Sequence, residues 1–374
     1  MADLHWKKLY DYRERNAVNE SSINFGGLRI GVLTVLPNQQ HLEFVVQLAT
    51  FLYSSWIHMI ENINVTNNVS NSTTYNKIDL LIFTEKKNLE KLLPGCILVQ
   101  HQEQLETTRP QCLYLATTEI NHPYTFINTY AFLNSPLFRN VTSAYDYLLR
   151  TDLDVFLSPT LLTYRPTRSL ITGKGGYCVN FTKGHLVELA QRLGYQHRHI
   201  HNLGSTWFGK AELLANLSFY ASELSMKIYD TEFDPKLHPE IAKFMSLSDN
   251  GKWAEWWRPT SSMYAQELVL NQFLQDLSSE TVRGGLLDVE SCRSSKISNH
   301  LHVHTWHGKC EFNKFNFLNE VVHKHLQSGK YQLNLRYAKR KAVDSMPVKE
   351  YCRYITQHAL FNLAEWFAQY TDNE

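Results

Sequence analysis

The chain has 374 residues, of which 43% are hydrophobic and 20% are charged, a composition typical of a globular protein with two lobes or one large α/β unit. The formal net charge is +1, so no overall field favours nucleic acid or an anionic membrane, and a phosphate-bearing ligand would need a local site. The sequence contains no P-loop, no GxGxxG after the first predicted strand and no basic helix, which argues against a nucleic-acid-binding module. It also lacks GxSxG, so serine hydrolase chemistry has no support.

Taken in chain order, the elements begin after a polar N-terminal tail, residues 1–27. Short apolar runs predict strands and longer periodic segments predict helices. The predicted strands cover residues 28–36, 78–84, 96–100, 112–116, 147–151 and 176–180. The predicted helices cover residues 41–60, 85–93, 126–138, 182–193, 264–274 and 351–370.

This alternation predicts an α/β fold whose sheet is mixed but mainly parallel and flanked by helices. We expect a catalytic domain over residues 28–325 and a helical C-terminal extension over residues 326–374. Ligands of such sheets bind at the carboxyl ends of the strands, which makes Thr34, near the end of the first strand, a candidate ligand-binding residue.

The compartment is predicted from conflicting signals. Residues 1–8 contain no apolar signal core, and the apolar run 42–60 carries polar side chains and reads as a buried helix rather than a membrane span. Glycosylation sequons are nevertheless frequent, and three of them fall within residues 64–73, a predicted solvated loop. We expect the secretory-pathway lumen, the Golgi, if a leader or anchor is missing from this chain, and otherwise the cytoplasm.

Six cysteines are present and none forms a CxxC pair, so a thiolate zinc site is not expected. Proximity along the chain suggests two disulfides, Cys96–Cys112 and Cys292–Cys310. Buried free thiols are the alternative.

Asp152 and Asp154 come at the end of the predicted strand 147–151. Two acids at positions i and i+2 of a turn can bind one hard cation, and Mn²⁺ or Mg²⁺ bound in this way often bridges to substrate phosphates. Such an ion would neutralise the charge that builds on a departing nucleoside diphosphate, which would give Asp154 a part in catalysis. The alternative is a pair of surface aspartates in a turn.

The segment Asp-Tyr-Leu-Leu-Arg-Thr-Asp-Leu-Asp-Val-Phe-Leu, residues 146–157, resembles the metal-binding strand of GT-A-fold glycosyltransferases. The resemblance covers residues 28–310 in layout, but only this motif matches closely, and no particular family is indicated. It implies a GT-A-like fold, a nucleotide-diphosphate sugar as donor with a UDP-sugar favoured, and a hydroxyl acceptor on a glycan, protein or lipid.

The same resemblance gives roles to later residues. The segment 199–209 is similar to the one that lines the sugar, and Glu267 stands where such enzymes have an acid that contacts the acceptor or acts as base. An apolar setting on the predicted helix 264–274 would raise the pKa of Glu267 toward a useful range. The alternative is a glutamate on the helix surface.

A dense histidine cluster occupies residues 300–307. Strand alternation places His300, His302 and His304 on one face, and the resemblance makes His302 or His304 a third metal ligand, with His304 preferred. His307 and Lys309 are candidates for contact with the diphosphate. The alternative is a set of structural or surface histidines.

Two other functions compete with glycosyl transfer. One is a metal-dependent hydrolase or oxygenase in which several histidines converge on one metal, because HxH pairs suit zinc or iron better than manganese. The other is a non-catalytic glycan-binding relative with a Trp-rich surface. Loss of the aspartates would leave ligand binding intact in the second case.

Overall fold

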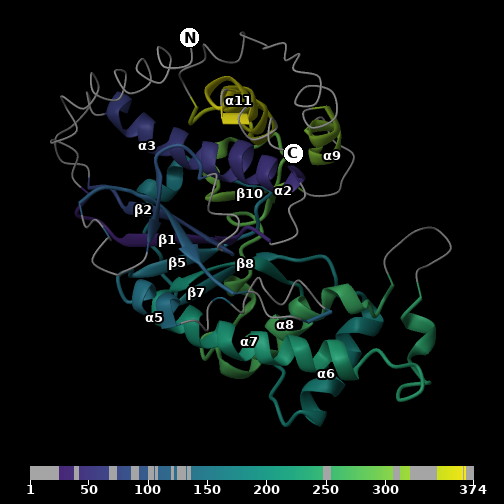
Figure 1. Cartoon of the computed structure of the whole chain (residues 1–374). Coiled ribbons are helices and arrows are strands. Elements are labelled where there is room, and N and C mark those ends of the chain that lie inside the picture. Colours follow the sequence, from purple (N-terminus) through teal and green to yellow (C-terminus); the bar gives the residue numbers. More distant parts are fainter. Residues whose placement is uncertain are drawn as a thin grey trace.

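The computed structural model is a mixed α/β molecule in which helices flank a central sheet (Figure 1). It describes residues 25–37, 42–66, 74–85, 92–99, 105, 108–118, 122–123, 132, 136–246, 254–305, 312–320, 343–364 and 366–367.

The main sheet has seven strands in the order β3-β4-β2-β1-β5-β8-β7. All neighbouring pairs are parallel except those of β8, which runs antiparallel to both β5 and β7. The prediction of a mixed, mainly parallel sheet is therefore confirmed. The strands are β1 (Arg29–Val35), β2 (Lys77–Thr84), β3 (Cys96–Val99), β4 (Cys112–Ala116), β5 (Tyr147–Arg150), β7 (Leu170–Lys174) and β8 (Leu203–Lys210).

A second sheet has three short strands in the order β6-β10-β9, and β6 follows the two aspartates directly in the chain. It comprises β6 (Val155–Leu157), β9 (Val289–Glu290) and β10 (His302–His304). Because β10 runs antiparallel to β6, His304 pairs with Val155. This register brings the predicted histidine strand back to the DxD although about 150 residues separate them along the chain.

Helices cover both faces of the main sheet, as Figure 1 shows. Alternation along β1 explains the two layers: Ile30 and Val32 pack with α2 and α3, whereas Leu33 packs with α7 and α8. The α-helices are α2 (Leu42–Gln47), α3 (Ser54–Thr66), α5 (Pro136–Thr142), α6 (Asn180–Arg192), α7 (Ala211–Thr231), α8 (Ser261–Phe273), α9 (Lys314–Leu318) and α11 (Val348–Asn362). The other helical turns are the π-helix η2 (Leu48–Tyr53) and the 3-10 turns η7 (Pro159–Leu162), η8 (Ala242–Phe244), η9 (Arg258–Thr260), η10 (Ser279–Thr281) and η11 (Ile297–Asn299).

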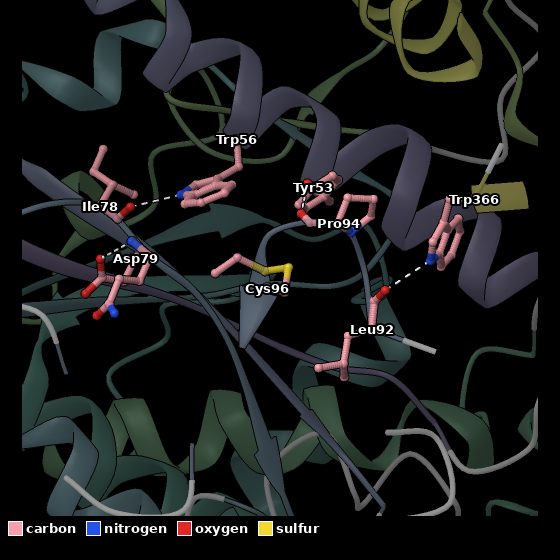
Figure 2. Close-up of a disulfide and its surroundings, with 10 residues drawn as sticks. Tyr53, Trp56, Ile78, Asp79, Leu92, Pro94, Cys96 and Trp366 are labelled. Atoms are coloured by element: carbon pink, nitrogen blue, oxygen red, sulfur yellow. Dashed lines mark hydrogen bonds between the residues drawn. A yellow bond between two sulfur atoms is a disulfide. The ribbon is translucent and has the colours of Figure 1, made fainter. Parts of the chain in front are cut away.

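Aromatic side chains of η2, α3 and the segment after α11 donate hydrogen bonds to the main sheet and to the chain before β3 (Figure 2). The indole N–H of Trp56 donates to the carbonyl of Ile78 at 2.9 Å. Tyr53 and Trp366 donate in the same way to the carbonyls of Pro94 and Leu92. These bonds satisfy buried polar groups while the rings fill the core.

The predicted Cys96–Cys112 disulfide is confirmed, and it joins paired residues of β3 and β4. Cys292 is also disulfide-bonded, but its predicted partner Cys310 lies outside the described residues.

The predicted strand at residues 176–180 is wrong, since the strand is β7 and ends at Lys174. Tyr177 and Cys178 give this segment an apolar pattern, but they are buried around Glu267 and do not lie in a sheet. The long helix α7 was not predicted. The predicted helices 85–93 and 126–138 fall largely outside the described residues.

Within the described part of the chain, no helix has both the length and the apolar character needed to span a membrane.

Candidate functional site

The DxD turn lies at the carboxyl end of β5, in the middle of the sheet. It is fixed on both sides by backbone hydrogen bonds. The N–H of Thr151 donates to Leu33 of β1 at 2.9 Å, and the N–H of Thr305, just after β10, donates to the carbonyl of Asp154 at 3.0 Å. The turn therefore joins the main sheet to the small one, where a bound ligand could contact both.

Asp152, Asp154 and His304 form a group whose ligand atoms all lie within 4.8 Å of one another. Nε2 of His304 is 3.3 Å from Oδ1 of Asp154 and 4.0 Å from Oδ2 of Asp152. The structure thus brings together the two predicted aspartates and the preferred histidine. Two carboxylates and one imidazole are a suitable set for a divalent cation.

Positive charge already surrounds this group. Nζ of Lys314, at the start of α9, is 2.5 Å from Oδ2 of Asp154. Burial would raise the pKa of Asp154, but His304 and Lys314 outweigh it and hold that pKa well below its usual range. Burial likewise opposes charge on His304, but Asp154 and Asp288 raise its pKa well above the ordinary value. Asp154 is therefore ionised, as a metal ligand must be, whereas His304 would have to release its proton to bind a metal.

Asp288 is a site residue that the sequence analysis missed. Its side chain is 3% exposed, and its Oδ1 is 3.6 Å from Nδ1 of His304 and 2.5 Å from the Thr206 hydroxyl. Gly173 and Gly204 approach it with backbone alone, since a Cβ on either would come within 1.7 or 2.6 Å of its carboxylate. No motif in the sequence marks this aspartate, because its partners come from β8 and β10.

The structure does not bring His302, the other predicted histidine ligand, into this group. Its Nδ1 accepts a hydrogen bond from the Asp288 N–H at 3.3 Å, which leaves the proton on Nε2 for donation to the Thr151 hydroxyl at 2.6 Å. Both ring nitrogens are therefore occupied. Burial is the largest effect on this ring and lowers the pKa of His302 to about 4, so it is a neutral structural residue.

Three other predicted site residues are Thr34, His307 and Lys309. The hydroxyl of Thr34 is buried in β1 and has no hydrogen-bond partner among the described residues. His307 and Lys309 lie outside the described residues.

The predicted sugar-lining segment does meet the DxD. The hydroxyl of Ser205 is 3.1 Å from Oδ2 of Asp152, and Arg150 contacts both residues, at 2.7 Å from the Ser205 carbonyl and 3.1 Å from Oδ1 of Asp152. Asp152 is therefore oriented by β8 as well as by β5.

Glu267 is not a surface glutamate, because its side chain on α8 is fully buried. Burial would raise its pKa, as predicted, but interactions with His197, His201 and Tyr177 outweigh burial and lower the pKa to about 2. The expected pKa is therefore wrong in direction. Its carboxylate oxygens accept hydrogen bonds from Tyr177, Asn202 and His201 at 2.7–2.8 Å, so it acts as a hydrogen-bond acceptor for its neighbours.

Comparison with known proteins gives one family. No curated protein matches the sequence. A family model described as "Domain of unknown function (DUF7164)" matches residues 24–368, which include both sheets, the DxD turn and Glu267. The chain therefore belongs to the DUF7164 family.

Proposed function

We propose that this protein is a metal-dependent glycosyltransferase with a GT-A-like fold, which transfers a sugar from a nucleotide-diphosphate donor, a UDP-sugar first, to a hydroxyl acceptor on a glycan, protein or lipid. The observation that carries the proposal is the group of Asp152, Asp154 and His304 at the carboxyl end of the central strand β5. Open α/β sheets bind their ligands at this edge.

The donor set fits Mn²⁺ or Mg²⁺. Carboxylate oxygens are the preferred ligands of both ions, and one imidazole favours manganese. When bound, the ion would neutralise charge on the departing nucleoside diphosphate. Around it, Asp288 would orient His304, Ser205 and Arg150 would orient Asp152, and Lys314 would offer a cation to the diphosphate.

The competing hydrolase or oxygenase requires several histidines on one metal. Among the described residues of this cluster, only His304 contacts the aspartates of the DxD. His302 is bound to Thr151, and the ring of His300 is bound to Ser295 and to the Gly285 carbonyl. The described histidines of the 300–307 cluster therefore do not converge on one metal, so the geometry at the DxD favours the transferase over a hydrolase built on that cluster. A separate group, His197, His199 and His201, does bring its ligand atoms within 4.8 Å of one another.

The disulfide chemistry supports a secretory-pathway lumen, which we propose as the compartment. Disulfides persist in oxidising compartments and are rare in the cytosol. Cys96, Cys112 and Cys292 are all disulfide-bonded.

The test is a thermal-shift matrix of UDP, GDP, ADP and CMP, each with and without Mn²⁺. A metal shared by the protein and the diphosphate couples the two ligands, so we expect UDP and Mn²⁺ together to stabilise the protein by more than the sum of their separate shifts. Asp154→Asn should abolish this coupling, and Asp276→Asn, at an exposed aspartate, should retain it. Additive shifts with every nucleotide would contradict the proposal, and coupling that survives Asp154→Asn would contradict the assigned site.

A further inference from the structure

A second polar cluster is centred on Glu267 of α8. Its other members come from the loop before β8 and from the segment after β7, so they lie far from Glu267 in the sequence. Oε2 of Glu267 accepts hydrogen bonds from the Tyr177 hydroxyl and from the Asn202 N–H, each at 2.8 Å. Oε1 is 2.7 Å from Nδ1 of His201 and 3.4 Å from Nε2 of His197. A buried carboxylate surrounded by donors in this way stays ionised and fixed in orientation.

His201 differs from its neighbour His197 in access to a ligand. The side chain of His201 is 13% exposed, whereas that of His197 is 1% exposed. An ionised carboxylate only accepts hydrogen bonds, so Nδ1 of His201 must carry the proton that it shares with Glu267. In the neutral ring Nε2 then holds a lone pair, and no described residue hydrogen-bonds to it. The imidazole is therefore held in the tautomer of a base.

The loop that carries His201 is held in an uncommon conformation. His199 and Asn202 have φ angles of 59° and 58°, in the left-handed region that side chains other than glycine rarely adopt. The Asn202 side chain secures the turn by accepting a hydrogen bond from the Cys178 N–H at 2.8 Å. Backbone strain of this kind persists where surrounding contacts enforce it, often at functional sites.

The cluster faces the same edge of the sheet as the DxD. Strand β8 runs antiparallel to β5, with Trp207 opposite Arg150, so the start of β8 projects beyond the carboxyl end of β5. Ser205 contacts Asp152, and His201 comes four residues earlier in the chain. At about 3.3 Å per residue of extended chain, their backbones are separated by at most about 13 Å. The two groups therefore lie close enough for one substrate to contact both at this edge of the sheet.

From these contacts we infer that His201 is the general base that activates the acceptor hydroxyl, and that Glu267 is a positioning residue acting through His201. The inference rests on the proposed glycosyltransferase function and names the group that removes the acceptor proton. It replaces the expectation that Glu267 itself meets the acceptor, since the Glu267 side chain is fully buried.

The step balances without any further reactant. The acceptor O–H gives its proton to Nε2 of His201 while its oxygen forms a bond to the anomeric carbon. The bond between that carbon and the diphosphate oxygen breaks, and its electron pair leaves with the nucleoside diphosphate. His201 becomes an imidazolium beside the Glu267 carboxylate and then returns the proton to water.

This chemistry predicts the stereochemical outcome. A single displacement inverts the anomeric carbon, whereas retention through a covalent intermediate needs a carboxylate that can attack it. The carboxylate of Glu267 cannot attack, because it is fully buried and its oxygens already accept hydrogen bonds. We therefore expect an inverting enzyme.

The test uses the full chain with Mn²⁺ and measures nucleotide release from UDP-glucose, UDP-galactose, UDP-N-acetylglucosamine and GDP-mannose, with water as acceptor. His201→Ala should lower kcat by roughly 10²–10⁴-fold, the usual contribution of a general base, and should leave Mn²⁺–UDP binding unchanged. Added imidazole should restore part of the lost rate by entering the vacated space. His238→Asn is the matched control, because it changes a partly exposed histidine after α7, outside the loop that carries His201 and outside the segment 199–209, and it should keep the wild-type rate.

Two further measurements separate a base from a structural residue. Early proton NMR spectra of the released sugar should show the anomer opposite to that of the donor. Nitrogen NMR should find Nε2 of His201 unprotonated in the neutral wild-type ring and protonated in Glu267→Gln, whose amide N–H₂ can face Nδ1.

An unchanged kcat in His201→Ala, or a retained anomer, would overturn the inference while leaving the transferase in place. Wild-type protein that binds Mn²⁺ and UDP cooperatively but turns over no donor would also overturn it, and would leave nucleotide binding as the supported function. Absence of both binding and turnover would reject the proposed function itself.

Discussion

At the scale of single residues, the metal group depends on a carboxylate that would not touch the metal. Asp288 is within 3.6 Å of Nδ1 of His304, the nitrogen opposite the one that faces Asp154. An acid in this position fixes the ring and increases its basicity, and such partners commonly change metal affinity by about 10–100-fold when they are mutated. The φ of Asp288 is 52°, a value that asparagine also tolerates.

Asp288→Asn should therefore weaken Mn²⁺ binding in the presence of UDP by roughly 10–100-fold without unfolding the protein. The amide keeps the size and backbone preference of the side chain but loses the charge that holds His304. Titration calorimetry with Mn²⁺ measures the effect, and Asp276→Asn, at an exposed aspartate, is the control. Wild-type affinity in Asp288→Asn would show that His304 does not rely on this contact.

Lys314 competes for Asp154 with any bound cation. Its ammonium group donates a charge-assisted hydrogen bond to Oδ2 of Asp154. Lys314→Met retains the length and apolar stem of the side chain but removes the charge. We expect Mn²⁺ alone to bind more tightly to this variant, because Asp154 no longer exchanges one cation for another.

With UDP present, Lys314→Met should bind Mn²⁺ less tightly than the wild type. In the wild type the lysine that the metal displaces from Asp154 can contact the diphosphate, and the variant lacks this contact. The coupling between Mn²⁺ and UDP in thermal-shift assays should thus be smaller in Lys314→Met than in wild type. Equal coupling in the two proteins would mean that Lys314 only neutralises Asp154.

The residue roles show where sequence reasoning stops. Asp152 and Asp154 could be predicted because both lie in one short segment after an apolar strand. Asp288 and the His201–Glu267 contact could not, since each depends on which strand or helix lies opposite. The pKa of Glu267 was predicted in the wrong direction because burial is visible in an apolar pattern, whereas the donors that oppose it come from distant segments.

At the scale of elements, the contact between α3 and α11 contains a histidine pair, of which His58 is buried and His358 is partly exposed. His58 on α3 is 5% exposed and packs against the rings of Tyr354 and His358 on α11. Burial, with a smaller effect of His358, lowers the pKa of His58 from 6.5 to about 3. The folded protein therefore holds this ring neutral, whereas the unfolded chain binds a proton below pH 6.5.

Acid should weaken this contact. Because the folded pKa lies below the unfolded one, the contribution of His58 is fully present above pH 6.5 and is lost as the pH falls toward 3. The slope in that window is about 1.4 kcal/mol per pH unit. His58→Phe should make the free energy of unfolding fall less steeply with acidification, as measured by urea unfolding between about pH 7 and about pH 5. The exposed control His199→Asn should keep the wild-type slope, and an unchanged slope in His58→Phe would exclude His58 as its source.

Elements were predicted best where one local pattern decides them. The first strands, β1, β2 and β4, were found within one residue of their ends because apolar β-branched runs between turn residues have few alternatives. The strand at residues 176–180 failed because Tyr177 and Cys178 are buried around a polar group, and burial alone does not identify a strand. The π-helix η2 inside the long N-terminal helix also carries no simple sequence pattern.

At the scale of the whole molecule, the metal group at β5 lies several strands away from the edge strand β3, which a disulfide joins to β4. β3 is the edge strand and pairs only with β4, and three strands, β4, β2 and β1, separate it from β5. The Cys96–Cys112 disulfide joins this edge strand to its neighbour, while Tyr53 and Trp366 hold the chain that precedes it (Figure 2). Edge strands have fewer partners than central ones, and here the disulfide adds a covalent link to the single strand that pairs with β3.

Replacing both cysteines of that disulfide with alanine should therefore destabilise the fold without altering the metal group. The bridge closes a loop of 16 residues, and a loop of about 15 residues contributes roughly 3 kcal/mol by restricting the unfolded chain. Urea unfolding should show a loss of that order, and Cys96→Ala alone should lose as much, since either change removes the bridge. The coupling of Mn²⁺ and UDP, measured well below the unfolding temperature, should stay at the wild-type value because β5 and β8 form no part of that edge. If the coupling fell with the disulfide, the sheet would transmit the state of its edge to the site, and edge and site could not be treated as independent.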